Sequence, residues 1–422
     1  MTKRPRLLIS GAYGYGNIGD EAILRGMLLA LREAIPDADF VVLSGNPALT
    51  RTQHGVQAAH RVLFLPSLRQ MVAFGLSRTG RAQTRQLIRQ MRQADVFIVG
   101  GGGLLYDLVN TAKAMWLEKF YLFGWPISQV AIEIGLARAL SKPVVLYAVG
   151  IGPVTTRLGK LLLRRIARQV ALITVRDQAS RAILSRFEVP ADWIHVTADP
   201  AILIPPAPSE EVAAILSQAG VSNDRRPFIG LALRSWYPYA MINKGAAAER
   251  QARWERDMAE AADRLVQSLD TELVFVPMQD YAELLDDAAC SDRVIAQMKH
   301  RERTRRLPRG LAPSVVMGAL GAMDLVVAMR LHALILAAAM STPVVGVIYA
   351  PKVRGFLESI GQPDAGLEMD KLSPEALVKA VGSVWAQREV MGAQVAATVE
   401  HLRAQARLNA TLVADFLVSR DD

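Results

Sequence analysis

Cysteine is nearly absent from this chain of 422 residues, in which Cys290 is the one thiol. A single thiol excludes an internal disulfide and any metal cluster built from several thiolates. Histidine and carboxylate residues do not group with the spacing of metal ligands either. We therefore expect a protein of a reducing compartment that uses no metal and no cofactor.

Long apolar runs are also missing. The most apolar long window, 121–140, contains Glu133 and Arg138 and has Pro126 near its start, so it predicts a buried helix rather than a membrane span. At the N-terminus, basic residues precede a short apolar run that Gly11 interrupts, which is not the pattern of a signal peptide. We expect a cytoplasmic protein, and peripheral contact with the inner membrane surface stays open.

Aromatic residues make up 6% of the chain, and no helix-turn-helix, zinc-finger or RNA-binding signature is present, so nucleic acid is not an expected partner. The formal charge of +9 instead favours phosphates, anionic lipids or anionic glycans. The densest basic stretch runs from Lys299 to Arg306 and continues to Arg309. Two interpretations of it stay open: a solvated helix face, or a contact with headgroups or a diphosphate.

Short β-branched runs alternate with amphipathic segments along most of the chain, which is typical of parallel sheets covered by helices. In the first half the predicted strands are 7–10, 40–43, 62–65, 96–99, 144–149, 172–175 and, at an edge, 193–196, with helices at 21–34 and 84–93. In the second half they are 228–233, 273–277, 325–328 and 344–348, with helices at 246–269, 313–322 and 331–339. This order predicts two α/β domains.

A proline-rich segment, 199–208, interrupts the alternation, because neither a helix nor a central strand tolerates several prolines. We therefore predict an α/β domain over 1–200, a second over 201–375, and helices over 376–422 that pack back on the first domain. Two Rossmann-like domains that face each other leave a cleft at the carboxyl ends of their strands, where ligands of such sheets bind.

The first strand is followed by Gly14-x-Gly16-x-x-Gly19, which spells the dinucleotide-binding fingerprint. Two features disfavour NAD: the second strand ends without the carboxylate that would hold the ribose, and Asp20 with its acidic neighbour would meet the pyrophosphate. Asp20 is better interpreted as the helix N-cap. Asn17 can bond to turn amides or reach into the cleft, and a simple tight turn stays open for the whole segment.

Two further glycine clusters follow predicted strands. The run 100–103 consists of four glycines, and 150–153 reads Gly-Ile-Gly-Pro. Because no side chain can pack there, we expect loops whose backbone amides meet an anion or another segment. Gly101 and Gly102 are the predicted floor of the cleft.

Cations follow the strands as well: Arg176, Arg234, Arg330 and, shortly after the last strand, Lys352. Guanidinium groups bind carboxylate and phosphate bidentately and lysine supplies a point charge, so the set suits a small polyanion, although each residue could also form an ordinary ion pair. His332 lies beside Arg330, which disfavours the cationic imidazole, so this histidine can carry a proton near neutral pH.

Taken together, the segments GYGNIGDEA, VGGGGLLYD and VRD, and above all MRLHALILAA followed by PVVGVIYAPK, resemble the polysaccharide pyruvyl transferase family. The likeness covers most of residues 7–360 and is greatest to the bacterial cell-wall branch that pyruvylates N-acetylmannosamine. It implies a fold similar to the GT-B glycosyltransferases. It also implies transfer of the enolpyruvyl unit of phosphoenolpyruvate onto two hydroxyls of one sugar as a cyclic ketal, with release of phosphate.

The resemblance also implies site residues. The family's donor-binding motif falls on Arg176, Arg330, His332 and Lys352, with Arg234 as an addition. In this interpretation His332 donates the proton in catalysis, and the cations bind phosphoenolpyruvate. The acceptor, which would be a lipid-linked glycan, would meet Asn17, Asp20, Gly101 and Gly102, although the polar residues of this set could equally cap turns.

The aromatic loop 235–241 could stack on a sugar. Two alternatives stay open: a nucleotide-sugar glycosyltransferase of the same shape, and a non-catalytic protein of an envelope assembly that binds anions or glycans. The sequence does not determine the acceptor sugar, its carrier or the oligomeric state.

Overall fold

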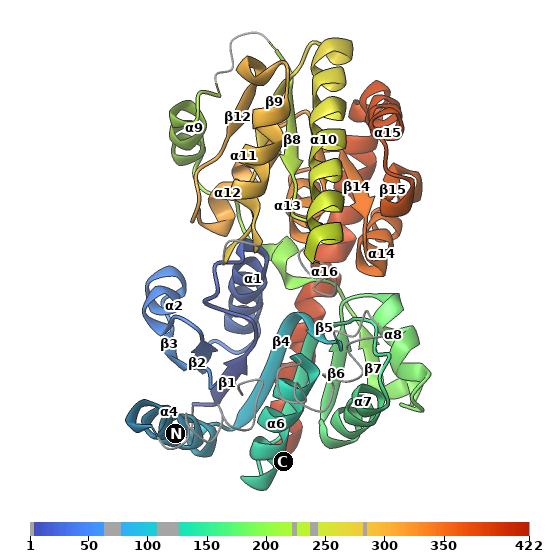
Figure 1. The fold of residues 1–422 in the computed structure, drawn as a ribbon. Helices are drawn as coiled ribbons and strands as arrows, with labels where there is room; N and C mark the ends of the chain where they lie inside the picture. The colour runs from blue at the N-terminus through green and yellow to red at the C-terminus, as the bar shows by residue number, and fades with distance from the viewer. Residues whose placement is uncertain are drawn as a thin grey trace. The chain divides into compact units, whose positions relative to one another are not determined.

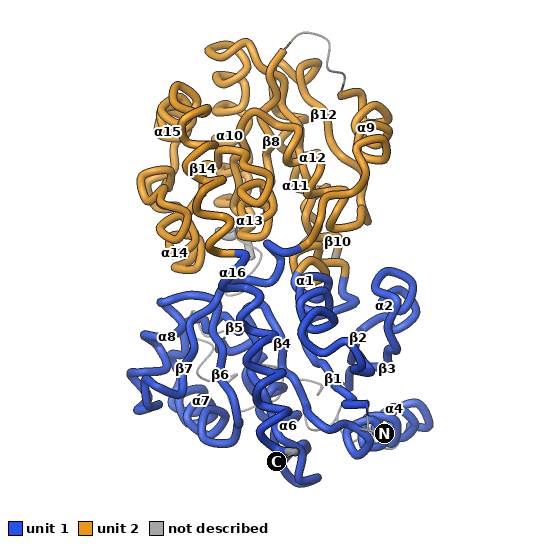
Figure 2. Tube along the Cα trace, turned by 180° about the vertical axis from the view of Figure 1, so that it is seen from behind, with its two compact units in different colours: residues 1–15, 23–203, 403–422 blue, residues 16–22, 204–402 orange. Residues whose placement is uncertain are grey.

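The computed structural model describes residues 4–62, 77–107, 126–221, 226–236, 244–281 and 285–421. It divides into two compact units, shown in two colours in Figure 2. Unit 1 consists of residues 1–15, 23–203 and 403–422, and unit 2 of residues 16–22 and 204–402. Each unit is built on a parallel sheet with helices, which confirms the predicted α/β class.

The sheet of unit 1 has the strand order β3-β2-β1-β4-β5-β6-β7, with every neighbouring pair parallel. Its central strands are buried on both faces, which explains their unbroken runs of Val, Ile and Leu. The strands are β1 Arg6–Ser10, β2 Asp39–Ser44, β3 Gln57–His60, β4 Val96–Leu105, β5 Val144–Ile151, β6 Leu172–Val175 and β7 Ile194–Val196.

Helices connect these strands, and Figure 1 shows α6 and α7 side by side over one face of the sheet. They are α1 Ile18–Ala34, α2 Pro47–His54, α4 Arg78–Gln93, α6 Pro126–Ala139, α7 Arg157–Gln169 and α8 Gln178–Ser185, with short 3-10 turns at Ala191–Trp193 and Pro200–Leu203. The first turn of α1 belongs to unit 2. In α6, the carboxylate of Glu133 is 1% exposed and pairs with Arg61 at 2.8 Å. The charge that argued against a membrane span is therefore paired inside the unit.

Unit 1 differs from the predicted strands at three places. The third strand of the sheet is Gln57–His60, which the sequence did not predict; of the predicted strand 62–65, Val62 is not in a strand and 63–65 lie outside the described residues. The strand predicted at 96–99 continues to Leu105, so the four glycines lie in β4 and pair with β5 instead of forming a loop. Likewise β5 extends to Ile151, through the first glycine of the third cluster.

The glycines of β4 serve close packing. A β carbon on Gly100 would lie 2.3 Å from the methyl carbon of Met27, and one on Gly101 would lie 1.9 Å from Cγ2 of Ile23, both on α1. Gly101 also has φ +58° and Gly102 φ +78°, in the left-handed region that favours glycine. The helix can therefore approach this strand only where side chains are missing.

Unit 2 has the parallel strand order β12-β9-β8-β13-β14-β15. The strands are β8 Phe228–Ala232, β9 Glu272–Phe275, β12 Thr304–Arg306, β13 Leu325–Ala328, β14 Val344–Ile348 and β15 Gly366–Glu368, with a small antiparallel pair, β10 Asp280–Tyr281 and β11 Leu285–Asp286. The sequence predicted four of these strands. It missed the short edge strands β12 and β15 and the small pair.

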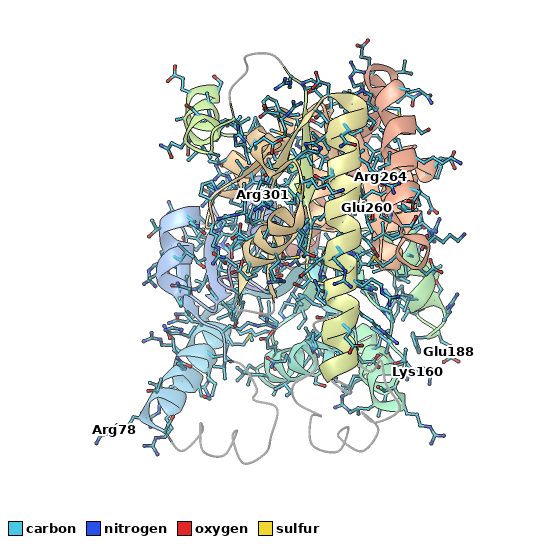
Figure 3. The ribbon with its side chains drawn as sticks, turned by 45° about the horizontal axis from the view of Figure 1, so that its top comes forward. Arg78, Lys160, Glu188, Glu260, Arg264 and Arg301 are labelled. Carbon is cyan, nitrogen blue, oxygen red and sulfur yellow. The ribbon has the colours of Figure 1, made fainter. Side chains whose placement is uncertain are left out.

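The helices of unit 2 are α9 Ser209–Gln218, α10 Lys244–Leu269, α11 Asp287–Gln297, α12 Pro313–Gly321, α13 Leu331–Ala339, α14 Pro351–Ser359 and α15 Pro374–Ala386, with 3-10 turns at Arg301–Arg303, Pro363–Ala365 and Met369–Lys371. Arg264 on α10 pairs with Glu260 one turn away (Figure 3) and with Glu375 of α15 at 2.7 Å. Such exposed pairs contribute little to stability.

The C-terminal helix α16, Arg388–Asp421, ends in unit 1. There Asn409 is buried, its side-chain oxygen accepts hydrogen bonds from the hydroxyls of Thr174 and Thr197, and its amide donates to the carbonyl of Ala198. The last part of the tail therefore packs on the first sheet, as the sequence predicted. Within the described residues, no helix combines the length and apolarity that a bilayer span requires.

Candidate functional site

Three neighbouring strands of unit 2, β8, β13 and β14, are parallel, so their carboxyl ends lie at one edge of the sheet. Arg234 follows β8, Arg330 follows β13, and Tyr349 follows β14 directly. Lys352 is the second residue of α14, which begins right after Tyr349 and Ala350. We call Arg234, Arg330 and Lys352 the basic cluster.

The phenol ring of Tyr349 lies within the basic cluster. The guanidinium carbon of Arg234 lies 5.2 Å from the ring centroid, and Nζ of Lys352 lies 5.5 Å from it. The indole of Trp236 meets the same ring edge-on, with centroids 5.7 Å apart and planes at 73°. Two cation–π contacts and one aromatic contact thus fix this side chain.

The basic cluster changes the acidity of Tyr349. Burial of the phenol works to raise its pKa, but the positive charges of Lys352, Arg234 and Arg330, and a hydrogen bond with Lys352, outweigh it and lower the pKa to about 8. A substantial fraction of this phenol is therefore ionised in mildly alkaline solution, unlike an ordinary tyrosine.

Lys352 is exposed and stands in the first turn of α14. A cation is unfavourable there, because the helix dipole places partial positive charge at the N-terminus. Helix stability therefore does not explain this lysine. The first turn of α13 begins at the same sheet edge, right after Arg330, so two helix N-termini and three cations create a positive potential suited to an anion.

Arg330 forms a bidentate ion pair with Asp287, the first residue of α11. Its Nε lies 2.9 Å from one carboxylate oxygen and its Nη2 lies 2.6 Å from the other. The side chain of Asp287 is 1% exposed and that of Arg330 is 13% exposed. Burial raises the pKa of Asp287, while the charges of Arg330 and Arg234 oppose this rise. The pair fixes the direction of the Arg330 guanidinium.

His332 is the second residue of α13 and is partly buried. Its imidazole meets the glycine loop of the N-terminal segment: a β carbon on Gly19 would lie 2.1 Å from Nδ1 of His332 and 2.9 Å from its Cβ. The loop is held beside it by backbone pairing, with a bridge between Asn17 and Gln279 and a bond from the amide of Ile18 to the carbonyl of Met278 at 2.9 Å. The third glycine of the fingerprint therefore makes room for a histidine, not for a pyrophosphate.

The start of α1 differs from the prediction. The helix begins at Ile18, and the side-chain oxygen of Asn17 accepts a hydrogen bond from the amide of Gly19 at 3.0 Å. Asn17 therefore caps the helix, and the prediction that Asp20 is the N-cap is wrong. Asp20 and Glu21 lie in the first turn, where negative charge favours the helix dipole.

Arg176 belongs to unit 1, where its side chain is 4% exposed. Its Nη1 lies 2.7 Å from the carboxylate of Asp199, and its Nε lies 3.6 Å from Asp177. A β carbon on Gly150 would lie 2.7 Å from this guanidinium, so the glycine after Val149 admits the arginine. Of the predicted catalytic residue and the four predicted donor-binding residues, unit 2 holds His332, Arg234, Arg330 and Lys352.

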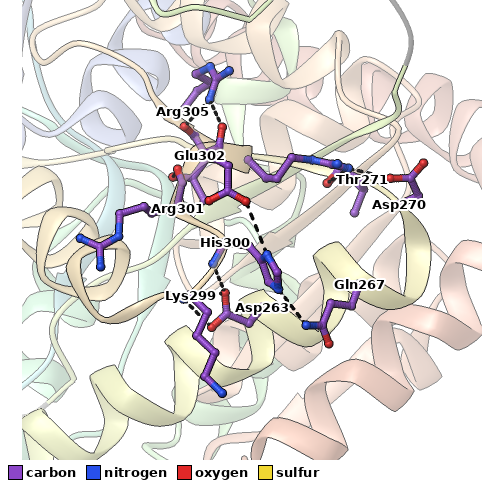
Figure 4. A network of polar contacts seen from close by, with 11 residues as sticks. Asp263, Gln267, Asp270, Thr271, Lys299, His300, Arg301, Glu302 and Arg305 are labelled. Atoms are coloured by element: carbon purple, nitrogen blue, oxygen red, sulfur yellow. Dashed lines mark hydrogen bonds and ion pairs between the residues drawn. The ribbon is translucent and has the colours of Figure 1, made fainter.

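The basic tract 299–309 is a 3-10 turn followed by the edge strand β12, so the interpretation as a helix face is wrong. Its backbone is anchored by Asp263, whose carboxylate accepts hydrogen bonds from the amides of Lys299 and His300 (Figure 4). Four of its five arginines have acidic neighbours: Arg303 with Asp270, Arg305 with Glu272, Arg306 with Asp292 and Arg309 with Asp286. Much of its charge is therefore balanced within the unit.

Sequence reasoning missed two residues of this site, Tyr349 and Asp287. A local signal existed for Tyr349, because it lies between a predicted strand and Lys352. Trp236 belongs to the aromatic loop already singled out, of which 237–241 lie outside the described residues. Nothing local marks Asp287, whose partner is 43 positions away.

Comparison with protein families gives a match over most of the chain. The model described as polysaccharide pyruvyl transferase matches residues 17–351. This range includes the glycine loop from Asn17 onward, the basic cluster except for Lys352, and His332.

Solved structures share the fold at low identity. A glycosyltransferase from Rickettsia africae has a TM-score of 0.59 at 13% identity, covering 100% of this chain and 99% of its own. Anabaena HepE in complex with UDP has a TM-score of 0.56 at 15% identity, covering 98% and 100%. The UDP-GlcNAc 2-epimerase of Neisseria meningitidis, bound to UDP-GlcNAc, has a TM-score of 0.59 at 10% identity, covering 98% and 100%. The architecture is thus GT-B-like.

Proposed function

We propose a donor and an acceptor on the basis that the chain belongs to the polysaccharide pyruvyl transferase family and is a transferase. The proposed donor is phosphoenolpyruvate, and the proposed acceptor is a sugar of a cell-wall glycan. The enolpyruvyl unit would be joined to two hydroxyls of this sugar as a cyclic ketal, with release of phosphate. The proposed acceptor is lipid-linked N-acetylmannosamine, and the proposed place of reaction is the cytoplasmic face of the membrane.

The observation that carries this proposal is the convergence of the basic cluster and two helix N-termini at one sheet edge. Phosphoenolpyruvate bears a carboxylate and a phosphate on three carbons, and guanidinium groups bind both bidentately. Cations preorganised in this way stabilise the charge that develops on a leaving phosphate. His332 follows Arg330 by two positions and supplies a group able to carry protons.

The chemistry assigns a step to each group. His332 protonates the methylene carbon of the donor, the adjacent carbon becomes electrophilic, and the first sugar hydroxyl adds to it. The second hydroxyl then displaces phosphate. Arg330 and Arg234 bind the donor anion, and Lys352 neutralises charge on the leaving phosphate.

The remaining predicted site residues complete the proposal. Arg176 would bind the donor carboxylate, which requires it to share its guanidinium with Asp199. The acceptor would meet Asn17 and Asp20 of the glycine loop. Gly101 and Gly102 would contribute backbone only, since α1 packs on their strand.

The experiment incubates the protein with phosphoenolpyruvate and a panel of lipid-linked sugars, and measures released phosphate and the mass of the product. We expect one acceptor to gain a pyruvate ketal. His332→Ala should abolish turnover and leave equilibrium binding of phosphoenolpyruvate within a few-fold, whereas Lys352→Ala should weaken that binding. His401→Ala, an exposed histidine of α16, is the matched control and should behave as the wild type.

The same panel tests the alternatives. Transfer of sugar from a UDP-sugar, without phosphate release from phosphoenolpyruvate, would replace the proposal with a glycosyltransferase. Saturable binding of phosphoenolpyruvate with no turnover on any acceptor would favour the binding protein instead.

A further inference from the structure

We propose that Tyr349 is a second proton carrier of this site: its phenol protonates the phosphate oxygen as that group leaves, and its phenolate then takes the proton of the second sugar hydroxyl. This inference rests on the proposed function and adds to it a residue and a division of labour. His332 would serve the addition of the first hydroxyl, and Tyr349 the substitution by the second.

The geometry supports this role, because the ring of Tyr349 contacts both Lys352, the residue assigned to the leaving phosphate, and Arg234 of the same basic cluster. Lys352 and Arg234 both contact its ring, at 5.5 Å and 5.2 Å from the centroid. A phenol next to the lysine that neutralises the leaving phosphate is well placed to share a proton with it. Its position directly after β14, a strand buried along its whole length, holds the ring at the sheet edge.

Every charged group identified around the phenol favours the state that remains after proton donation. Arg234 faces it from the end of β8, Arg330 from the end of β13, and Lys352 from α14. The carboxylate of the same site, Asp287 of α11, is paired with Arg330. A phenolate formed during the reaction would therefore be stabilised by three cations, whereas an isolated buried tyrosine would resist ionisation.

Binding of the donor prepares the phenol for its task. Without donor the phenol has a pKa of about 8. An anion that enters the basic cluster compensates the same cations and adds negative charge beside the ring, so it raises this pKa. Donor binding near pH 8 should therefore be coupled to proton uptake by Tyr349, and the bound state carries the proton that the second step needs.

The step balances in atoms and charge. After the first hydroxyl has added and the methylene has become a methyl group, the bond between the central carbon and the phosphate oxygen breaks, and the phenol proton moves to that oxygen. The second hydroxyl forms the new carbon–oxygen bond and gives its proton to the phenolate. One hydroxyl proton thus ends on the methyl group and the other on phosphate, and both proton carriers return to their starting states.

Tyr349→Phe tests the catalytic part, because it keeps the ring and its contacts with cations and removes only the hydroxyl. With the acceptor on which the wild type acts, kcat should fall by about 10²–10⁴-fold, the range for loss of a general acid. Mass spectrometry of quenched reactions should show an acceptor adduct that still carries phosphate. In His332→Ala this adduct should be missing.

The control is Tyr147→Phe. Tyr147 lies in β5 of unit 1, fully buried, and its hydroxyl has no hydrogen-bond partner among the described residues, so its loss should leave kcat unchanged. Wild-type kcat in Tyr349→Phe, with an unchanged melting temperature, would overturn the proposal. So would a slowed variant in which no phosphorylated adduct accumulates.

A second measurement does not depend on turnover. Titration calorimetry of phosphoenolpyruvate binding at pH 8, in two buffers with different ionisation enthalpies, should show uptake of about half a proton by the wild type. Tyr349→Phe should bind without it. If the wild type binds phosphoenolpyruvate but does not convert it with any acceptor, the proposed function fails. A loss of proton uptake in Tyr349→Phe would then still identify the phenol at the donor site. Equal proton uptake by the two proteins would overturn the inference.

Discussion

Gly19 lies against the imidazole of His332, so closely that a β carbon there would come within 2.1 Å of Nδ1. The two residues are more than 300 positions apart in the chain, yet both belong to unit 2. The glycine loop is attached to this unit by its own backbone bonds, through Asn17 and Ile18. The orientation of His332, the proposed proton donor, therefore depends on the absence of a side chain at Gly19 in the first turn of α1.

The first prediction follows from this contact. Gly19→Ala should turn the imidazole away and reduce kcat by at least about 10²-fold, similar to loss of His332 itself. Alanine is more favourable than glycine in a helix by about 1 kcal/mol. This gain offsets part of the steric cost, so we expect a small change in melting temperature beside a large loss of kcat. Steady-state kinetics and thermal unfolding measure both effects. Gly382→Ala on α15, where a β carbon meets nothing within 4 Å, is the matched control, and equal activity of the two variants would contradict the role of the contact.

The second prediction concerns the ionisation of Tyr349. Absorbance of phenolate near 295 nm, taken as the difference between wild type and Tyr349→Phe, should titrate with a midpoint of about 8. Lys352→Ala should move the midpoint upward, because it removes a cation while burial remains. Since this pKa is lower in the folded than in the unfolded state, the stability it contributes is present at alkaline pH and is lost as pH falls through about 8. A midpoint near 10 in the wild type would show that the basic cluster does not act on the phenol.

A third prediction addresses the pair between Asp287 and Arg330. Asp287→Ala should reduce the free energy of unfolding by about 3 kcal/mol, the lower end of the cost of breaking a buried pair, since Arg330 keeps some access to water. Asp292→Ala breaks the more exposed pair with Arg306 and should cost less than about 1 kcal/mol. Denaturant unfolding compares the two variants. Similar losses would mean that Asp287 is not an anchor of the site.

The fourth prediction concerns the C-terminal helix. Asn409→Ala removes the oxygen that accepts from the hydroxyls of Thr174 and Thr197, which then keep main-chain carbonyl acceptors at 3.3 Å and 3.1 Å. It also removes the amide that donates to the carbonyl of Ala198, so the free energy of unfolding should fall by about 1–3 kcal/mol. Thr411→Ala, at an exposed position two residues further on, should change it by less than about 0.5 kcal/mol. If Asn409→Ala is as stable as the wild type, the packing of α16 on unit 1 does not depend on these hydrogen bonds.

Runs of branched apolar residues were enough to place most strands, because a strand buried on both faces needs such a run whatever surrounds it. Two polar edge strands, β3 and β12, were not predicted for the same reason. Gln57–His60 and Thr304–Arg306 are polar, and they become strands because β2 and β9 offer them backbone partners.

The cations at strand ends could also be found from local order, since parallel strands bring their carboxyl ends to one edge. Their partners could not. These partners depend on contacts between distant segments. Asp287 pairs with Arg330, Asp199 pairs with Arg176, and the phenol of Tyr349 lies near three positive charges.

The glycines show the division most clearly. Composition and spacing marked Gly19 and Gly101 as positions without side chains, but the neighbour that requires each absence, an imidazole for one and a helix for the other, comes from packing between segments. The periodicity of apolar residues is a local property. It was enough to predict the α/β class and the order in which most strands follow one another along the chain. Proton chemistry depends on electrostatics at a few ångströms, which arise only when remote residues are folded against one another.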